Sequence, residues 1–321
     1  MENSEHHQVK VAAIIVSHNR RELLQRCIDK LHIQTYPLDK ILIVDNGSEN
    51  DVIIYLESIK SGDKRIELLL QENLGGAGGF ANGMKYALSE FIDLDYLWLM
   101  DDDGYPTESA LKELVDASKQ LDKTILNSFV VSDLSTKEMS FPFYNGIDKM
   151  LDEKKDIRYF VNKANFFNGT FIPTTVIDRL GFPIAKLFVK GDELEYFERA
   201  LIKLRIPLVT VRDSVFVHPP NTTDPEEDIP LNKIWHTYFT IRNMFYSHSF
   251  ESSLFQAKGI KHLIRMYLYF NYWMQYRNEI LEFQVTNKRL KKKIIFLALW
   301  HNITKNYKLK PKDINDLVNK N

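Results

Sequence analysis

Short apolar segments alternate with polar loops along the first third of the chain. Residues 9–16 and 40–44 are almost continuously apolar, and residues 66–70 form a third such run. Between the first two runs, apolar side chains recur at helical spacing from Leu23 to Leu31. Strands that are apolar on both faces, and that are separated by helices, are typical of a parallel sheet covered by helices on both sides. The pattern therefore predicts an α/β fold with a mostly parallel central sheet.

A fourth apolar run, residues 96–100, leads directly into three consecutive aspartates at residues 101–103. A glycine and a proline follow soon after, which is typical of a buried strand that ends in a loop. A divalent cation relieves the repulsion between adjacent carboxylates, and Mg²⁺ or Mn²⁺ prefers oxygen ligands while leaving positions for substrate phosphates. This favours nucleotide-diphosphate chemistry. The alternative is a solvated acidic turn that caps a helix beginning near Thr107.

Polar residues also follow the other predicted strands. Asn19 comes soon after the first strand, and Asp45 ends the second. Ligands of such sheets bind beyond the carboxyl ends of the strands, so we expect these residues to gather near the triple aspartate.

The third predicted strand leads into a loop, residues 71–83, with four glycines in five positions. Glycines allow the backbone to approach a ligand closely, and a following helix could offer its N–H groups to an anion. The loop contains no Gly-Lys-Ser/Thr and does not follow the first strand, so it is neither a Walker A loop nor a dinucleotide-binding fingerprint. The alternative is a tight turn that lets a helix pack closely on the sheet, and we expect both roles in part.

Composition narrows the classes of protein. The 321 residues can hold one large or two ordinary domains, and the formal net charge of −1 indicates no nucleic-acid partner. The single cysteine, Cys27, excludes a disulfide framework and suits a reducing cytosol. Residues 1–8 lack an apolar core of a secretory signal, and no later apolar run reaches the ~20 residues needed to span a bilayer. We therefore expect a cytoplasmic protein, with peripheral attachment to a membrane left open.

Four motifs together resemble a known family. The first strand ends in Ser-His-Asn-Arg, the second in Val-Asp-Asn-Gly-Ser, the loop reads Asn-Leu-Gly-Gly-Ala-Gly-Gly-Phe, and the fourth strand ends in Met-Asp-Asp-Asp. In this order they resemble family 2 glycosyltransferases of the GT-A fold, over about residues 9–250. The loop and the aspartates are most similar to bacterial galactofuranosyltransferases and their rhamnosyltransferase relatives. The resemblance implies a GT-A domain in residues 1–230 and a helical C-terminal region in residues 231–321.

The resemblance also implies the roles of individual residues. Asp45 would accept a hydrogen bond from the nucleotide base, with Ser17 and Asn19 lining the same pocket. Further nucleotide-sugar contacts would come from the glycine loop and the aspartates, namely Asn73, Gly75, Gly76, Asp101 and Asp102.

His218 ends an apolar strand, where a histidine is more often structural. The resemblance instead implies a metal ligand at this position. With Asp101 and Asp103, His218 would form a mixed nitrogen and oxygen site suited to Mn²⁺, with Mg²⁺ as the other cation considered.

A second acidic motif follows Lys190 and Gly191, where an apolar run ends and a helix begins. Acids at a helix start are favoured by the helix dipole, so Asp192 could simply cap the helix. The resemblance places the catalytic base here, with Glu193 in the base position and Asp192 beside it. This chain departs from the relatives at Gly191, where they have Trp, and at Glu193, where they have Asp, so both acids remain candidates.

The C-terminal third is expected to be helical from Trp235 almost to its end. Its first helix carries a Tyr-Phe and an Arg-Asn pair, at residues 238–239 and 242–243, that recur in the relatives where this helix packs beneath the site. Two more helices are predicted, at residues 254–283 and 287–302. Five basic residues between positions 288 and 293 precede an apolar run that ends in Trp300. This suits an amphipathic helix on anionic lipid, and packing on the catalytic domain or a second subunit is the alternative.

The resulting hypothesis is an inverting, metal-dependent glycosyltransferase that extends a bacterial surface polysaccharide. UDP-galactofuranose is the favoured donor, and the acceptor is a glycan or lipid-linked glycan, with the enzyme at the inner face of the plasma membrane. A dTDP-rhamnose transferase is the alternative within the family. An alternative of another class is a non-catalytic sugar-nucleotide-binding subunit of a glycan assembly complex. Donor, linkage and homo-oligomeric state stay open.

Overall fold

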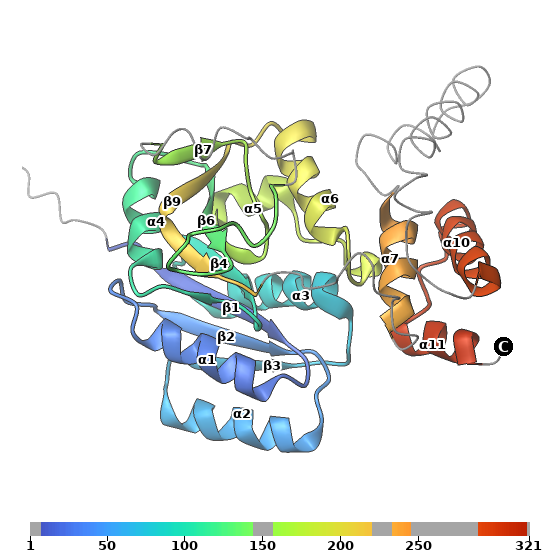
Figure 1. Cartoon of the computed structure of the whole chain (residues 1–321). Coiled ribbons are helices and arrows are strands. Elements are labelled where there is room, and N and C mark those ends of the chain that lie inside the picture. Colours follow the sequence, from blue (N-terminus) through green and yellow to red (C-terminus); the bar gives the residue numbers. More distant parts are fainter. Residues whose placement is uncertain (1–7, 144–156, 220–232, 245–287, 320–321) are drawn as a thin grey trace, which may run out of the picture. The chain divides into compact units, whose positions relative to one another are not determined.

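The computed structural model describes residues 8–143, 157–219, 233–244 and 288–319 (Figure 1). The chain divides into two compact units, and each is described by itself. The first unit comprises Met1–Ala185 with Arg199–Asn221, and the second comprises Lys186–Glu198 with Thr222–Asn321. The expected boundary after residue 230 stays a prediction. The compact units differ from it because the segment Lys186–Glu198 groups with the C-terminal helices.

The first unit is built on a mixed sheet. Its strands are β1 (Val11–Ser17), β2 (Lys40–Asp45), β3 (Ile66–Leu70), β4 (Tyr96–Asp101), β5 (Tyr105–Pro106), β6 (Ile125–Val131), β7 (Tyr159–Val161), β8 (Asn168–Pro173) and β9 (Leu208–Val217). In the described part of the chain they form one nine-stranded sheet of order β3-β2-β1-β4-β8-β6-β9-β5, with β7 paired to β9. Strands β3, β2, β1 and β4 are all parallel, as the four apolar runs predict. Strand β8 is antiparallel to both β4 and β6, while β6 and β9 are parallel.

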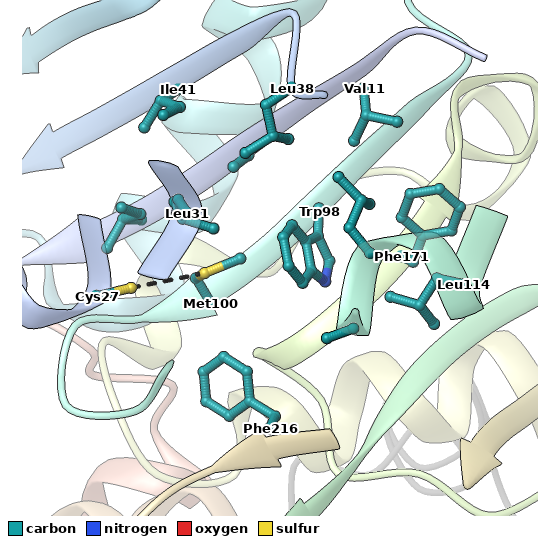
Figure 2. Close-up of a cluster of buried hydrophobic side chains, with 14 of the residues drawn as sticks. Val11, Cys27, Leu31, Leu38, Ile41, Trp98, Met100, Leu114, Phe171 and Phe216 are labelled. Carbon is teal, nitrogen blue, oxygen red and sulfur yellow. Dashed lines mark hydrogen bonds between the residues drawn. The ribbon is translucent and has the colours of Figure 1, made fainter. Parts of the chain in front are cut away.

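Helices cover both faces of this sheet. They are α1 (Arg21–His32), α2 (Asn50–Gly62), α3 (Gly75–Glu90), α4 (Ala110–Ser118) and α5 (Thr174–Leu180). The short helical turn η3 (Arg199–Lys203) also belongs to this unit, and the turn η2 (Ala185–Leu187) spans the boundary in the chain between the two units. Successive side chains of a strand point to opposite faces. In β1, Ala13 and Ile15 belong to the same buried cluster as Cys27 of α1 and Leu114 of α4, part of which Figure 2 shows. The predicted α/β class with two covered faces is confirmed.

The opposite face of β1 packs against α3. A Cβ atom added at Gly79 would lie 2.5 Å from Val16 Cγ1, and one at Gly83 would lie 2.8 Å from Val44 Cγ2. Such contacts are too close for a side chain, so these two glycines let α3 approach the sheet. The tight-packing interpretation of the glycine-rich stretch therefore holds for them.

The second unit contains α6 (Asp192–Glu198), α7 (Ile234–Met244), α10 (Lys288–Ile303) and α11 (Pro311–Asn319). Helix α7 packs against α10 and α11, and its buried Tyr238 and Phe239 share an apolar core with Ile294 and Ile314. The helix predicted at residues 287–302 is confirmed as α10, while the one predicted at residues 254–283 lies outside the described residues. Within the described residues, the model has no helix that combines the length and the hydropathy needed to cross a bilayer.

Candidate functional site

The predicted site residues of the parallel strands meet at one edge of the sheet. Ser17 at the end of β1 pairs in register with Asp45 at the end of β2. On the other side of β1, Val16 pairs with Asp101 at the end of β4. The carboxyl ends of these parallel strands thus bring the polar loops together, as the sequence pattern predicts.

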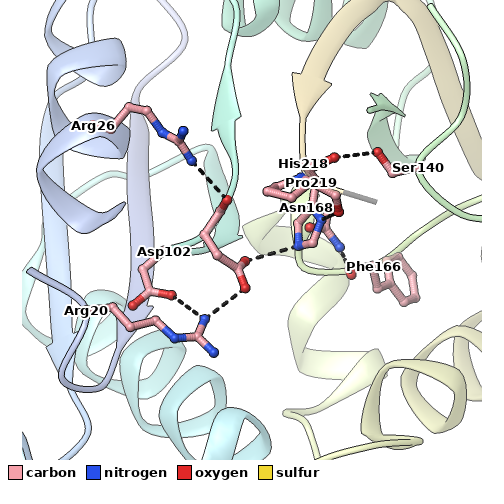
Figure 3. A network of polar contacts seen from close by, with 9 residues as sticks. Arg20, Arg26, Asp102, Ser140, Phe166, Asn168, His218 and Pro219 are labelled. Atoms are coloured by element: carbon pink, nitrogen blue, oxygen red, sulfur yellow. Dashed lines mark hydrogen bonds and ion pairs between the residues drawn. The ribbon is translucent and has the colours of Figure 1, made fainter. Parts of the chain in front are cut away.

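Asp102 is bonded to Arg20 of the loop after β1 (Figure 3) and to Ser17 at the end of that strand. Asp102 is 2% exposed. Oδ2 accepts a hydrogen bond of 2.8 Å from Ser17 Oγ, and Oδ1 accepts one of 3.0 Å from Arg20 Nη1. Burial raises the pKa of Asp102, although Arg20 and Ser17 oppose that effect. Asp102 therefore fixes the loop that follows β1.

Asp103 lies between Arg20 and His218. Its Oδ2 accepts a hydrogen bond of 2.8 Å from Arg20 Nη1, and its Oδ1 is 3.1 Å from His218 Nε2. Its backbone carbonyl accepts a longer hydrogen bond, 3.4 Å, from Arg26 Nη2. Burial acts to raise the pKa of Asp103, but His218 and Arg20 together outweigh it and hold that pKa below its ordinary value. The ionised carboxylate is therefore the favoured form of Asp103.

Two hydrogen bonds fix the backbone of His218, and its ring packs against Phe141. The His218 N–H donates to the Val131 carbonyl at 2.9 Å, and the His218 carbonyl accepts from Ser140 Oγ at 2.7 Å. The two rings meet edge to face, with their centroids 5.0 Å apart. Nδ1 lies 2.6 Å from the Pro219 carbonyl oxygen. A carbonyl only accepts, so Nδ1 carries a proton. In the charged ring Nε2 donates to Asp103, and in the neutral ring it presents a lone pair toward Asp103. A lone pair and a carboxylate oxygen repel each other unless a proton or a cation lies between them.

These two donor atoms fit a divalent cation. Adjacent ligands of an octahedral ion, each at about 2.1 Å, are about 3 Å apart, and the measured separation is 3.1 Å. Within the described residues, no three His, Cys, Asp or Glu side chains form a group that could hold a metal ion. The backbone of Asp101 donates to the Phe167 carbonyl at 2.9 Å, and its role as a third metal ligand stays a prediction.

The loop after β2 surrounds the carboxylate of Asp45. The residue Asp45 is 1% exposed. Oδ2 accepts hydrogen bonds from the N–H groups of Gly47 and Ser48, at 3.2 and 3.0 Å, whereas Oδ1 has no hydrogen-bond partner among the described residues. Asn19 joins the two loops, because its N–H donates to Ser48 Oγ at 2.8 Å and its Oδ1 accepts from the Glu49 N–H at 2.7 Å.

The glycine loop is tied to the same edge by Asn46, a residue to which the sequence analysis assigned no role. Asn46 Nδ2 donates to the Gly75 carbonyl at 2.8 Å, and its Oδ1 accepts from Gln71 Nε2 and the Leu74 N–H. Asn73 Oδ1 accepts from the Gly75 N–H at 2.9 Å. Gly75, with a φ of +71°, begins α3, and Gly76 follows in its first turn.

Arg20 is the other functional residue that sequence reasoning missed. It directly follows Ser-His-Asn at the first strand end, and the available signal was a pair of arginines, Arg20 and Arg21, in a loop expected to lie near the three aspartates. Burial is the largest influence on the pKa of Arg20 and lowers it, but Asp102 and Asp103 outweigh burial and leave that pKa raised.

The second acidic motif belongs to the second unit. Asp192 is the first residue of α6 and is 2% exposed, whereas Glu193 is partly exposed and its Oε2 accepts a hydrogen bond of 3.1 Å from the Gly191 N–H. How these acids lie relative to Asp103 stays a prediction, because the two units are described separately.

Comparisons with known proteins identify the family of the chain. Residues 12–172 match the family described as Glycosyl transferase family 2. Galactofuranosyltransferase GlfT1 of Mycolicibacterium smegmatis is 30% identical over 229 residues, which cover 68% of this chain and 74% of that protein. GlfT1 of Mycobacterium tuberculosis is 30% identical over 217 residues, covering 65% of this chain and 70% of that protein.

A solved structure supports the fold. The crystal structure of GalNAc-T7 with UDP, GalNAc and Mn²⁺ has a TM-score of 0.53 at 13% sequence identity, and the match covers 84% of this chain and 57% of that chain. The expected GT-A class of α/β fold is thereby confirmed. The chain belongs to glycosyltransferase family 2 and is a glycosyltransferase.

Proposed function

We propose that this chain transfers galactofuranose from UDP-galactofuranose to a glycan or lipid-linked glycan, with inversion at the anomeric carbon and with the help of a divalent cation. The observation that carries the proposal is the pairing of Asp103 with His218 at the carboxyl edge of the sheet, 3.1 Å apart, in a glycosyltransferase chain. The 30% identity to the GlfT1 galactofuranosyltransferases supports the choice of sugar.

The metal-binding part of the proposal concerns Asp103, His218 and the predicted third ligand Asp101. A bound Mn²⁺ or Mg²⁺ supplies Lewis-acid stabilisation of the negative charge that develops on the leaving diphosphate. The GalNAc-T7 structure was solved with Mn²⁺. Arg20 and Ser17 hold Asp102, so the loop after β4 is fixed before the donor arrives.

We assign Asp45 to binding the nucleobase of the sugar donor. Its Oδ1 is buried and has no hydrogen-bond partner among the described residues, and a buried acceptor without a partner is unfavourable. An N–H group of the nucleobase would satisfy it. Ser17, Asn19 and the loop residues Asn73, Gly75 and Gly76 complete the proposed donor site.

The transfer step needs a carboxylate on the acceptor side. The acceptor hydroxyl oxygen forms a bond to the anomeric carbon while the bond from that carbon to the diphosphate oxygen breaks on the opposite side. The proton of the hydroxyl passes to the carboxylate of Glu193, with Asp192 as the other candidate. This arrangement inverts the anomeric configuration.

A donor screen tests the proposed function. Purified full-length protein is supplied with UDP-galactofuranose, UDP-galactopyranose or dTDP-rhamnose and a galactofuranose-ended acceptor, with and without Mn²⁺, and nucleotide release and product are measured. We expect release to be largest with UDP-galactofuranose and to rise with Mn²⁺. Nucleotide release from dTDP-rhamnose but from neither UDP-sugar would show that dTDP-rhamnose is the donor. Binding of nucleotide-sugars without transfer would support the non-catalytic alternative.

The membrane part of the proposal concerns the exposed face of α10. Phe296, Trp300 and Ile303 are 69%, 53% and 50% exposed, and the first two rings stack with centroids 6.4 Å apart. Their spacing of four and three residues places them on one side of the helix, while Ile294 and Ala298 are buried in the core shared with α7. Exposed cations precede them at Lys288, Arg289, Lys292 and Lys293.

A row of exposed aromatic side chains next to a basic cluster is typical of a helix that lies on anionic lipid. We propose that α10 attaches the enzyme to such a surface, where each cation contributes about 1 kcal/mol. Replacing both Phe296 and Trp300 by serine should weaken binding to phosphatidylglycerol vesicles at least ~10-fold, because each buried aromatic contributes about 1.5–3 kcal/mol. Vesicle co-sedimentation of the full chain measures this.

The matched control is the double variant Ile54→Ser and Ile92→Ser, since those side chains are 63% and 83% exposed elsewhere in the chain. It should bind vesicles normally. Unchanged vesicle binding by the α10 variant would show that this face does not contact the membrane. A change in its oligomeric state instead would show that the face packs on a second subunit.

A further inference from the structure

The segment that leads into α6 has an unusual backbone. Phe188, Lys190 and Gly191 have φ angles of +69°, +63° and +84°. Left-handed conformations are unfavourable for residues with a Cβ atom, and two of the three are such residues. Because so short a segment does not select this path by itself, contacts from elsewhere must hold it.

Asn243 of α7 supplies those contacts. It is 3% exposed, and its Nδ2 lies 2.9 Å from the Leu187 carbonyl, 2.9 Å from that of Val189 and 2.7 Å from that of Lys190. Its Oδ1 accepts a hydrogen bond of 2.9 Å from Arg242 Nε, which fixes the orientation of the amide. One side chain thus contacts three carbonyl oxygens of the segment.

Arg242 reinforces the same segment from a fully buried position. Its Nη2 donates to the Leu187 carbonyl at 2.7 Å, and its guanidinium lies 4.5 Å from the ring centre of Phe239 and 5.0 Å from that of Tyr307. Burial lowers the pKa of Arg242. Among the described residues no carboxylate forms an ion pair with it and its Nη1 has no hydrogen-bond partner. A buried charge without a carboxylate partner is poor for stability, so the presence of Arg242 here calls for another explanation.

The segment passes its conformation directly to the acidic motif. The Gly191 N–H donates to Glu193 Oε2 at 3.1 Å, and the Gly191 carbonyl accepts from the Glu195 N–H at 3.0 Å. A Cβ atom at Gly191 would lie 3.3 Å from Asn243 Cβ, so α7 and the turn are in close contact. The position of the Glu193 carboxylate therefore depends on Asn243 through two hydrogen-bonded steps.

We infer that Arg242 and Asn243 are positioning residues, which hold residues 187–191 in the one conformation that orients the carboxylates at the start of α6. The inference rests on the proposed function of Glu193 and Asp192. It gives the Arg-Asn pair of α7 a role in the reaction that does not require contact with the substrate.

The test is the full-length Asn243→Asp variant, which keeps the shape of the side chain but turns a donor toward three carbonyls into an acceptor. We expect kcat to fall about 10- to 100-fold, because small displacements of a catalytic group have effects of that size. The donor KM should change less than about 2-fold, because binding to the donor is separate from proton removal. Hydrogen exchange at the amides of residues 188–193 should become faster.

The control is Tyr36→Phe in the first unit. It removes a hydrogen bond of 2.8 Å from Tyr36 Oη to the Val9 carbonyl oxygen, whereas Arg242 and residues 187–191 belong to the second unit. It should lower the melting temperature while kcat and the exchange of residues 188–193 stay near normal. If Asn243→Asp does not fold, Asn243→Ser, which keeps one donor, should show an intermediate loss of kcat.

Normal kcat and normal exchange in a folded Asn243 variant would overturn the inference, and so would an equal loss of kcat in Tyr36→Phe. Failure of the proposed function has a different signature. If Glu193→Gln and Asp192→Asn are both fully active, the acids are not the base, and faster exchange in Asn243→Asp would then show a purely structural contact and overturn the positioning role as well.

Discussion

Replacing Asp103 by asparagine should lower sugar transfer by about 10²- to 10³-fold, the usual effect of removing one electrostatic stabiliser of a developing negative charge. Asp103 faces His218 Nε2 at 3.1 Å and Arg20 Nη1 at 2.8 Å. Asparagine keeps the shape but removes the charge that would hold a cation beside the histidine. The rate of nucleotide release with Mn²⁺, and calorimetry of UDP binding with and without Mn²⁺, measure the loss.

The matched control is Asp116→Asn, which removes a surface carboxylate that pairs with Lys112 and Lys119. Exposed pairs of this kind contribute ~1 kcal/mol or less, so transfer should be unchanged. His218→Ala should weaken Mn²⁺-dependent UDP binding in parallel with Asp103→Asn. Metal-dependent binding that is unaffected by His218→Ala would remove His218 from the metal site.

Arg20 explains how adjacent aspartates coexist at this edge before any cation is bound. A single nitrogen, Nη1, donates to Asp102 at 3.0 Å and to Asp103 at 2.8 Å. The two acids then differ, because Asp102 is almost completely buried and bonded to Ser17, whereas Asp103 faces His218. From their adjacent positions in the chain, Asp102 and Asp103 would be expected to have the same role, but their different contacts indicate different roles.

The parallel half of the fold could be predicted from the sequence because its strands are buried on both faces. Ala13 and Ile15 of β1 belong to the cluster that includes α1 and α4, and Val16 faces α3 through Gly79. Both faces must then be apolar, and this leaves a continuous run that pattern analysis finds. The rule that ligands bind at the carboxyl ends of such strands predicted that the loops carrying Asn19, Asp45 and the aspartates meet.

The antiparallel half and the polar contacts could not be predicted in this way. Strand β8 inserts between β4 and β6, so that Leu99 pairs with Thr170, and no local pattern determines which distant strands become neighbours. The same holds for Arg20 on Asp102 and for Asn46 on the glycine loop, since both depend on loop conformations. His218 was assigned through the resemblance, because its position after an apolar strand alone favours a structural role.

The largest predicted effect on turnover falls on the acidic motif. Glu193→Gln should lower transfer by about 10²- to 10⁴-fold, the typical effect of removing a general base, while UDP-sugar and Mn²⁺ still bind. The base acts on the acceptor hydroxyl in the transition state and contributes little to holding the donor. Single-turnover transfer and calorimetry on the same sample separate the two effects.

Asp192→Asn is the necessary control, because the family resemblance leaves both acids as candidates for the base. The structure makes the two acids unequal, since Asp192 is 2% exposed while Glu193 is partly exposed and its Oε2 is oriented by the Gly191 N–H. A carboxylate that must meet an incoming hydroxyl needs an accessible oxygen, which favours Glu193. Near-normal transfer by Glu193→Gln beside an inactive Asp192→Asn would move the base by one residue, and full activity in both variants would exclude this motif from catalysis.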